Sequence, residues 1–143
     1  MLCVAWGSLG ACASGPSEPQ DVLELLEAPE QADDAFAESP VAVPEGLVAG
    51  SQRWVGETGV ARYWAAVGAD GEVCLVGYLA GAAPTYGSTC ASLEAFASRG
   101  LQLGVRAGGT TADAWLLPDD DDDTAAVEAQ GYRSVAANLL AKP

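Results

Sequence analysis

Beyond residue 50, the chain contains several short runs in which apolar and polar residues alternate, and such alternation is typical of β-strands. The clearest pair of runs spans residues 60–68 and 72–80, with Asp70-Gly71 between them. Asp-Gly is a strong hairpin signal, because a two-residue turn requires positive φ angles. We therefore predict a β-hairpin over residues 60–80, preceded by a strand at 53–57.

A two-residue turn at this position also predicts the register of the hairpin. It pairs Ala65 with Val76 on one face of the two strands. The opposite face then carries Trp64, Leu75 and Leu79. Both faces are apolar, which is expected of central strands that are covered on both sides.

The remainder of the domain is predicted to contain short helices, a second hairpin and a last strand. A Gly-Gly pair joins two alternating runs and pairs Leu103 with Ala114. Gly100 ends one helix, and Asp123 caps another. The predicted elements are a loop at 81–88, a helix at 90–99, strands at 101–107 and 111–117, a helix at 124–130 and a strand at 132–141.

This order of elements, β-β-β-α-β-β-α-β, predicts an α+β fold. We expect a mostly antiparallel sheet of five to six strands, with two short helices on one face. The chain has 143 residues, which favours a single domain with extra sequence at one end. We place that domain at residues 51–143.

Charge separates the N-terminal third from the rest of the chain. The formal net charge is −14, and residues 1–50 contain acidic side chains but no Lys or Arg. This acidic balance argues against nucleic-acid binding, which needs clustered basic residues. Residues 12–50 therefore form a predicted acidic, Pro-containing tether, with a short helix near 22–28 and with Phe36 and Leu47 as its contacts to the domain.

The first dozen residues suggest where the protein is located. An apolar run ends in Leu9-Gly10-Ala11-Cys12, which has the pattern of a lipobox in a bacterial lipoprotein signal. Residues 1–11 would then be removed, and Cys12 would carry the lipid, palmitate included. The anchored protein would lie on the outer face of the cell membrane. The alternative is a loosely apolar N-terminus that is kept.

The cysteine count agrees with export. The chain has four cysteines, and after Cys3 and Cys12 are assigned to the signal and the lipid, Cys74 and Cys90 remain. Two remaining cysteines in an exported protein are expected to form a disulfide. Metal binding by this pair is disfavoured, because the chain has no histidine and no Cys-x-x-Cys. A cytoplasmic domain with free thiols is a further alternative.

The acidic run at 119–123 is the conspicuous candidate for a metal site. Asp119, Asp121 and Asp123 have the spacing that begins a calcium-binding EF-hand loop. The match fails further on, because Thr124 and Gln130 stand where that loop needs Gly and Glu. We favour a solvated loop at the start of the following helix, and we expect no cofactor.

The second candidate site is a binding patch on the sheet. The predicted pairing brings Trp64, Leu75, Leu79 and Trp115 to the outer face, where an exposed aromatic patch would fit a protein or glycan partner. The competing interpretation, which we favour, is that residues 21–47 cover this face.

Catalytic motifs are weak. Without histidine, the usual base of nucleophilic catalysis is missing. Carboxylates for glycoside hydrolysis exist on paper at Glu57, Glu72 and Glu94, but no spacing brings any two of them together. We therefore expect a protein that is not an enzyme.

The layout resembles small exported lipoproteins of actinobacteria that have no assigned function. The resembling stretches are the lipobox, the acidic tether, Gly71-Glu72-Val73-Cys74-Leu75, Ser88-Thr89-Cys90 and residues 135–140. The resemblance implies an envelope location and no catalytic residues. We expect a monomeric, lipid-anchored envelope protein that binds or shields a surface partner. The alternative is a small envelope hydrolase that uses carboxylates or an Asp-bound divalent metal.

Overall fold

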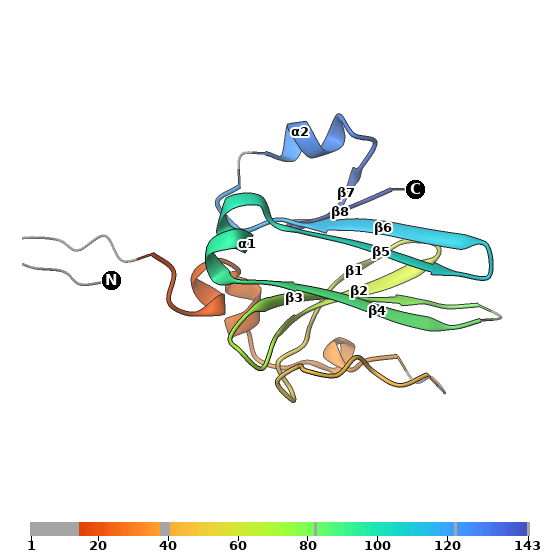
Figure 1. The fold of residues 1–143 in the computed structure, drawn as a ribbon, viewed down its shortest axis with the longest axis horizontal. Coiled ribbons are helices and arrows are strands. Elements are labelled where there is room, and N and C mark those ends of the chain that lie inside the picture. The colour runs from red at the N-terminus through yellow and green to blue at the C-terminus, as the bar shows by residue number, and fades with distance from the viewer. Residues whose placement is uncertain (1–14, 38–40, 82, 122, 143) are drawn as a thin grey trace, which may run out of the picture.

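Two four-stranded antiparallel sheets stack face to face in the computed structural model of the protein (Figure 1). The structure describes residues 15–37, 41–81, 83–121 and 123–142. Strand order is β1-β2-β3-β4 in the first sheet and β5-β6-β8-β7 in the second. The elements are β1 (Arg53–Glu57), β2 (Ala61–Val67), β3 (Val73–Leu79), β4 (Thr85–Ala91), α1 (Leu93–Arg99), β5 (Leu101–Ala107), β6 (Thr110–Leu116), α2 (Thr124–Glu128), β7 (Arg133–Ala136) and β8 (Leu139–Ala141).

The prediction of mostly antiparallel strands with two short helices is confirmed, but the prediction of one sheet of five to six strands is wrong, because the described residues form eight strands in two sheets. α1 carries the chain from β4 to β5, from one sheet to the other, and α2 lies outside the second sheet (Figure 1). The helices therefore do not share one face of one sheet. Two layers form because both hairpins have an apolar face, and each can bury that face against the other.

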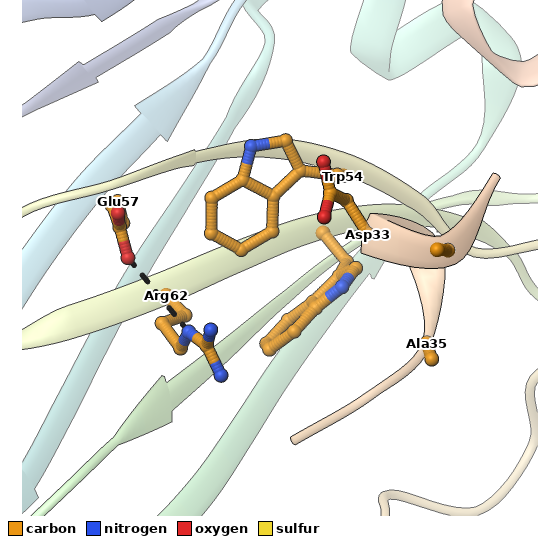
Figure 2. Close-up of a pocket in the computed structure, with 7 residues that line it drawn as sticks. Asp33, Ala35, Trp54, Glu57 and Arg62 are labelled. Atoms are coloured by element: carbon orange, nitrogen blue, oxygen red, sulfur yellow. Dashed lines mark ion pairs between the residues drawn. The ribbon is translucent and has the colours of Figure 1, made fainter.

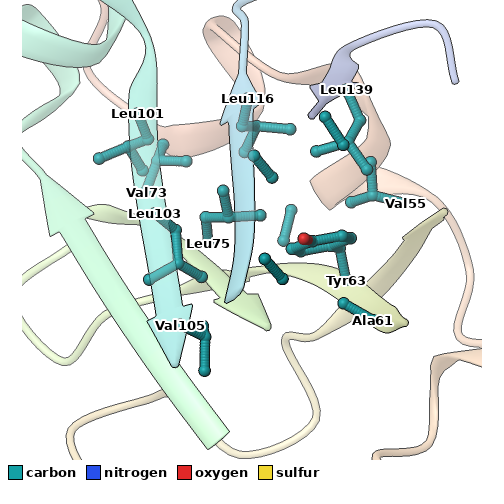
Figure 3. Packing of buried hydrophobic residues seen from close by; sticks show 14 of the residues in the cluster. Val55, Ala61, Tyr63, Val73, Leu75, Leu101, Leu103, Val105, Leu116 and Leu139 are labelled. Carbon is teal, nitrogen blue, oxygen red and sulfur yellow. The ribbon is translucent and has the colours of Figure 1, made fainter. Parts of the chain in front are cut away.

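The main core lies between the two sheets. Figure 3 shows side chains of β5 beside Val73, Leu75 and Tyr63 in one continuous cluster. Gly77 and Gly87 allow β5 to approach closely, since a Cβ at Gly87 would lie 2.8 Å from Val105 Cγ2. At Gly77, the corresponding distance to Leu103 Cδ2 is 3.0 Å.

The first hairpin forms where predicted, but its register is shifted by one residue. Ala65 pairs with Leu75 instead of Val76, because the loop has three residues, 69–71, instead of two. Gly71 N–H donates to the Gly68 carbonyl oxygen, and Gly71 has a φ of 79°. This is a type I turn followed by a left-handed residue, the common three-residue hairpin loop.

The shift moves a whole set of side chains, because a one-residue slip exchanges the two faces of a strand. Leu75 and Leu79 point into the core between the sheets, together with Tyr63. Trp64 pairs with Val76 on the outer face instead. All seven residues of β3 are buried, so both of its faces are covered.

The second hairpin has the predicted register. Leu103 pairs with Ala114, and Leu101, Val105, Ala112 and Leu116 also point into the core. The prediction of one last strand at 132–141 is wrong in one respect. Residues 137–138 form a turn that divides this segment into β7 and β8. Asn138 stabilises the turn region by donating from Nδ2 to the Leu117 carbonyl oxygen at 3.1 Å.

The predicted loop at 81–88 and the predicted helix start at residue 90 are both wrong. Residues 85–91 form β4, which pairs with β3 over its whole length. Its polar and small residues conceal the strand, because β4 lies at an edge of the sheet and none of its residues is fully buried. α1 begins after Ser92, whose Oγ accepts from Ala95 N–H at 3.2 Å, and it ends as predicted at Gly100, where φ is 69°.

Residues 19–37 pack along the sandwich, and we call them the N-terminal cover. They contain short 3-10 helices at Pro19–Asp21, Glu24–Glu27 and Ala32–Asp34 instead of the predicted helix at 22–28. Val22 and Leu23 are buried in the main core. Glu24 N–H donates to Asp119 Oδ2 at 2.7 Å, which joins the start of the cover to the loop after β6.

Candidate functional site

The outer face of the first sheet is covered by a cluster of aromatic side chains, the outer-face cluster. Trp64 lies at its centre and is 0% exposed. Its ring centroid lies 5.2 Å from that of Phe36 and 5.7 Å from that of Trp54, both in edge-to-face geometry. Tyr78 and Tyr86 complete the cluster, with their ring centroids 4.7 Å apart. Edge-to-face pairs of this kind stabilise a cluster beyond its buried area.

Phe36 and Leu47 contact this face, as predicted. Tyr86 ties the end of the cover to β4, because its hydroxyl donates to the Ala37 carbonyl oxygen at 2.8 Å. Burial raises the pKa of Tyr86.

The patch of Trp64, Leu75, Leu79 and Trp115 does not form. Leu75 and Leu79 lie in the main core, and Trp64 is buried at the centre of the outer-face cluster. Trp115 belongs to the second sheet, where it packs on Tyr132 at a centroid distance of 5.7 Å. The physical reason is the hairpin register, which places Leu75 and Leu79 on the face opposite Trp64.

A buried carboxylate attaches the N-terminal cover to β1. Asp34 is 5% exposed, and its Oδ1 accepts from Trp54 N–H at 2.6 Å while its Oδ2 accepts from Gln31 N–H at 2.7 Å. Arg53 Nε lies 4.0 Å from Asp34 Oδ2, and it donates to the Ala28 carbonyl oxygen at 2.7 Å. These contacts fix residues 31–34 beside Trp54.

A pocket of about 340 Å³ opens between the cover and the first sheet. We call it the Trp54 pocket (Figure 2). Figure 2 shows Glu57 and Arg62 together on one side of the Trp54 ring and Asp33 on the other. Its lining residues are Ala32, Asp33, Ala35, Trp54, Glu57, Arg62 and Trp64.

A β-bulge assembles one wall of this pocket. The pairing of β1 with β2 shifts between Trp54 and Gly56, so that Trp54 pairs with Trp64 and Glu57 pairs with Arg62. Strict alternation would place Trp54 and Glu57 on opposite faces, because they are three residues apart. Bulges re-aim side chains in this way, and here the bulge brings both residues to the outer face.

The polar groups of the Trp54 pocket are accessible to solvent and of mixed charge. The Arg62 guanidinium carbon lies 5.7 Å from the Trp54 ring centroid, and Arg62 Nε lies 3.8 Å from Glu57 Oε2. The Arg62 and Glu57 side chains are 48% and 60% exposed, and Asp33 is also exposed. Trp54 is half-buried, so part of its ring is available to a ligand.

Trp64 contributes the floor of the pocket. Its indole N–H is buried and has no hydrogen-bond partner among the residues that the structure describes. Its carbon atoms pack on Phe36 and Trp54. We therefore assign Trp64 a structural role beneath the pocket, and we assign the half-buried Trp54 the role of the aromatic surface that a ligand can reach.

The expected disulfide is present. Cys74 and Cys90 are bonded, at directly paired positions of β3 and β4. Cys74 is fully buried, whereas Cys90 lies exposed on β4, at the edge of the sheet. Cys90 was predicted in a helix, but it lies on β4, where it is directly opposite Cys74.

Described residues of the Asp run are held by hydrogen bonds within the protein. Asp119 accepts from Glu24 N–H and from Asn138 Nδ2, and Asp121 accepts from Asp123 N–H. Within residues 15–37, 41–81, 83–121 and 123–142, no group of three His, Cys, Asp or Glu side chains is placed to hold a metal ion. Asp123 precedes α2, as predicted, although its side chain makes no capping hydrogen bond.

Of the three carboxylates considered for catalysis, only Glu57 lines the Trp54 pocket. Glu72 lies beside the β2–β3 loop, which follows the end of β2, whereas Arg62 lies near the start of that strand. Glu94 lies in the first turn of α1. Asp33, Trp54 and Arg62, which also line the pocket, were not predicted as site residues. The sequence did carry one signal for this site. Arg62 and Trp64 are two residues apart on a predicted strand, so both were expected on the same face of the sheet.

Cys3, Cys12 and the rest of the predicted signal lie outside the described residues. In the part of the chain that is described, no helix has both the length and the apolar character needed to cross a membrane. Comparison with known protein families, with curated proteins and with solved structures found no match.

Proposed function

We propose that this protein is a non-enzymatic cell-envelope protein, exported and held by a lipid on Cys12, that binds a surface partner through the Trp54 pocket. The observation that carries the binding role is the pocket itself. It combines a half-buried aromatic ring with charged side chains that converge on it. Trp and Arg are the residues that most often dominate binding energy at recognition surfaces.

The disulfide supports the proposed location. Cys74–Cys90 is a structural bridge, and such bridges persist in oxidising compartments outside the cytoplasm. The lipid anchor rests on Leu9-Gly10-Ala11-Cys12. A short connection from Cys12 to the packed cover would hold the pocket close to the cell surface.

Two measurements on the full chain test this proposal. Mass spectrometry of the mature protein should find a diacylglyceryl group on Cys12, and an intact Met1 would contradict anchoring. Immobilised protein should retain material from a solubilised envelope fraction, and Trp54→Ala should lose most of that retention. Trp115→Ala is the matched control, since Trp115 is also half-buried but lies on the other sheet.

One observation favours the alternative of a small hydrolase. Asp33 and Glu57 both line the Trp54 pocket, and paired carboxylates are the usual catalytic groups for glycoside hydrolysis. Both side chains are exposed and Glu57 faces Arg62, whereas a general acid is normally kept protonated by burial in an apolar site. Release of reducing ends from envelope glycan that is lost in both Asp33→Asn and Glu57→Gln would establish the hydrolase and overturn the non-enzymatic role.

A further inference from the structure

We propose that the ligand of the Trp54 pocket is an uncharged sugar unit of an envelope glycan. This inference rests on the proposed function and names the chemical class of the partner. Three features of the pocket support it: the charges of the lining side chains, their hydrogen-bond donors and acceptors, and the rigid packing of the pocket walls.

The charges of the pocket disfavour ionic ligands of either sign. Arg62 already lies beside the Trp54 ring, in the place that a ligand cation would take for a cation–π contact. An anion would meet Asp33 and Glu57, in a protein whose formal net charge is −14. An uncharged ligand avoids both kinds of repulsion.

The same side chains suit hydroxyl groups. A guanidinium group offers only donors and a carboxylate offers only acceptors, whereas a hydroxyl can both donate and accept. A ligand with adjacent hydroxyls can therefore use Arg62 and Asp33 or Glu57 at the same time. The accessible part of the Trp54 ring supplies an apolar surface for the C–H groups of a sugar ring.

The pocket is organised before a ligand arrives. Asp34 holds Trp54 and residue 31 through two backbone hydrogen bonds, and Trp64 supports the Trp54 ring from below. Binding to ordered walls loses less conformational entropy than binding to mobile ones. The pocket volume of about 340 Å³ lies in the lower part of the range for small-molecule sites, about 300–1,000 Å³.

The test is titration of the full chain with oligosaccharides, in which tryptophan fluorescence and calorimetry measure binding. The probes are maltohexaose, cellohexaose, xylohexaose and chitotetraose, with deacetylated chitotetraose as a cationic probe and tetragalacturonate as an anionic one. At least one uncharged probe should bind saturably and more tightly than either charged probe. Its affinity should change little with salt, because screening acts on ionic attraction.

Variants locate the site. Trp54→Ala and Arg62→Ala should each weaken binding by about tenfold or more, as expected for central contact residues. Trp115→Ala and Arg106→Ala are their controls on the second sheet, and Trp54→Phe should keep part of the affinity. Thermal unfolding of each variant distinguishes lost contacts from lost fold. Absence of binding by every uncharged probe, or loss of binding in Trp115→Ala alone, would overturn the inference.

A second arm separates this inference from the function on which it rests. Competition with an excess of each uncharged oligosaccharide should release the retained envelope material in at least one case if a sugar is bound. Retention that resists every oligosaccharide but is lost in Trp54→Ala leaves the binding role standing and overturns the sugar. Absence of any retention by the wild type overturns both.

Discussion

At the scale of single residues, Asp34 is the charged side chain on which the pocket depends. Most of the other acidic residues of the described chain are exposed, but Asp34 is buried and accepts two backbone hydrogen bonds. These bonds satisfy the N–H groups of Gln31 and Trp54 where the cover meets β1. Asp34 is therefore an acidic residue with a specific structural role, unlike those that only add charge to the surface.

Replacing Asp34 by alanine should destabilise the protein by about 1–3 kcal/mol, because it leaves two N–H groups without their partner at a half-buried site. Urea unfolding measures this loss. Asp33→Ala is the matched control, and it should change stability by less than about 0.5 kcal/mol because Asp33 is exposed. Equal effects of the two substitutions would contradict the assigned role.

Gly87 has a packing role that no local sequence pattern reveals. It lies on β4 directly beneath Val105 of β5, where a Cβ would lie 2.8 Å from Val105 Cγ2. A glycine at this point allows the two sheets to approach. Its role is a property of the contact between sheets and not of the strand that contains it.

Gly87→Ala should destabilise the protein by about 1–2 kcal/mol. Overpacking costs about 1–3 kcal/mol, and part of this is offset because alanine has less backbone entropy than glycine to lose when the unfolded chain folds. Combining it with Val105→Ala should cost less than the sum of the two single changes, by about 1 kcal/mol. Chemical denaturation of all four proteins gives the coupling. Gly59→Ala, with open space around it, should be nearly neutral.

At the scale of elements, β4 is the strand with the weakest sequence signal. It lies at an edge of the first sheet, and its outer-face residues Ser88 and Cys90 are exposed. The disulfide joins it to the buried strand β3 at paired positions. A covalent bond thus supports the strand that buries little apolar surface of its own.

Replacing both Cys74 and Cys90 by alanine should lower the free energy of unfolding by about 3 kcal/mol, the loop-entropy value for a sequence separation of 16 residues. Amide hydrogen exchange should increase most in β4, because an edge strand opens before the central strands do. Unchanged exchange in β4 would show that its backbone pairing alone is sufficient. The double substitution avoids leaving one free thiol.

The two hairpins show how far local rules reach. The Gly-Gly turn gave the correct pairing of Leu103 with Ala114. At Asp70-Gly71 the predicted two-residue turn was wrong, because only the three-residue loop matches the observed pairing of Ala65 with Leu75. Both loops are compatible with Asp-Gly, and burial of Leu75 between the sheets distinguishes them.

At the scale of the whole molecule, the two sheets meet around Tyr63. Its side chain is 1% exposed and belongs to the main core. Burial raises the pKa of Tyr63 to about 12, and the negative charge of Asp113 contributes. The ionisation of this phenol is therefore coupled to the separation of the sheets.

Stability should fall as the pH rises from about 10 to about 12. The Tyr63 phenol titrates near 10 in the unfolded chain and near 12 in the folded protein, so the unfolded state binds fewer protons in this interval. The stabilising contribution is fully present below pH 10. Urea unfolding of Tyr63→Phe should show a shallower decline between these pH values than wild type, and parallel curves would contradict the coupling.

The sequence by itself determined the antiparallel strands, the second hairpin, the helix stop at Gly100 and the cysteines that form the disulfide. These features depend on short-range alternation, turn chemistry and composition, which are readable within about ten residues. It also indicated that Phe36 and Leu47 would contact the domain. Its expectations about Cys12, the lipid and the partner stay predictions.

Only the tertiary structure decided the two-layer arrangement and the site. The Trp54 pocket needs a bulge in β1, a cover held by Asp34 and a register set by burial of Leu75. Each of these depends on contacts between segments that are far apart in the chain, and a local pattern carries no information about them. The apolar outer face of the first sheet was predicted as a patch or a covered surface, and packing made it a covered surface with the Trp54 pocket at its margin.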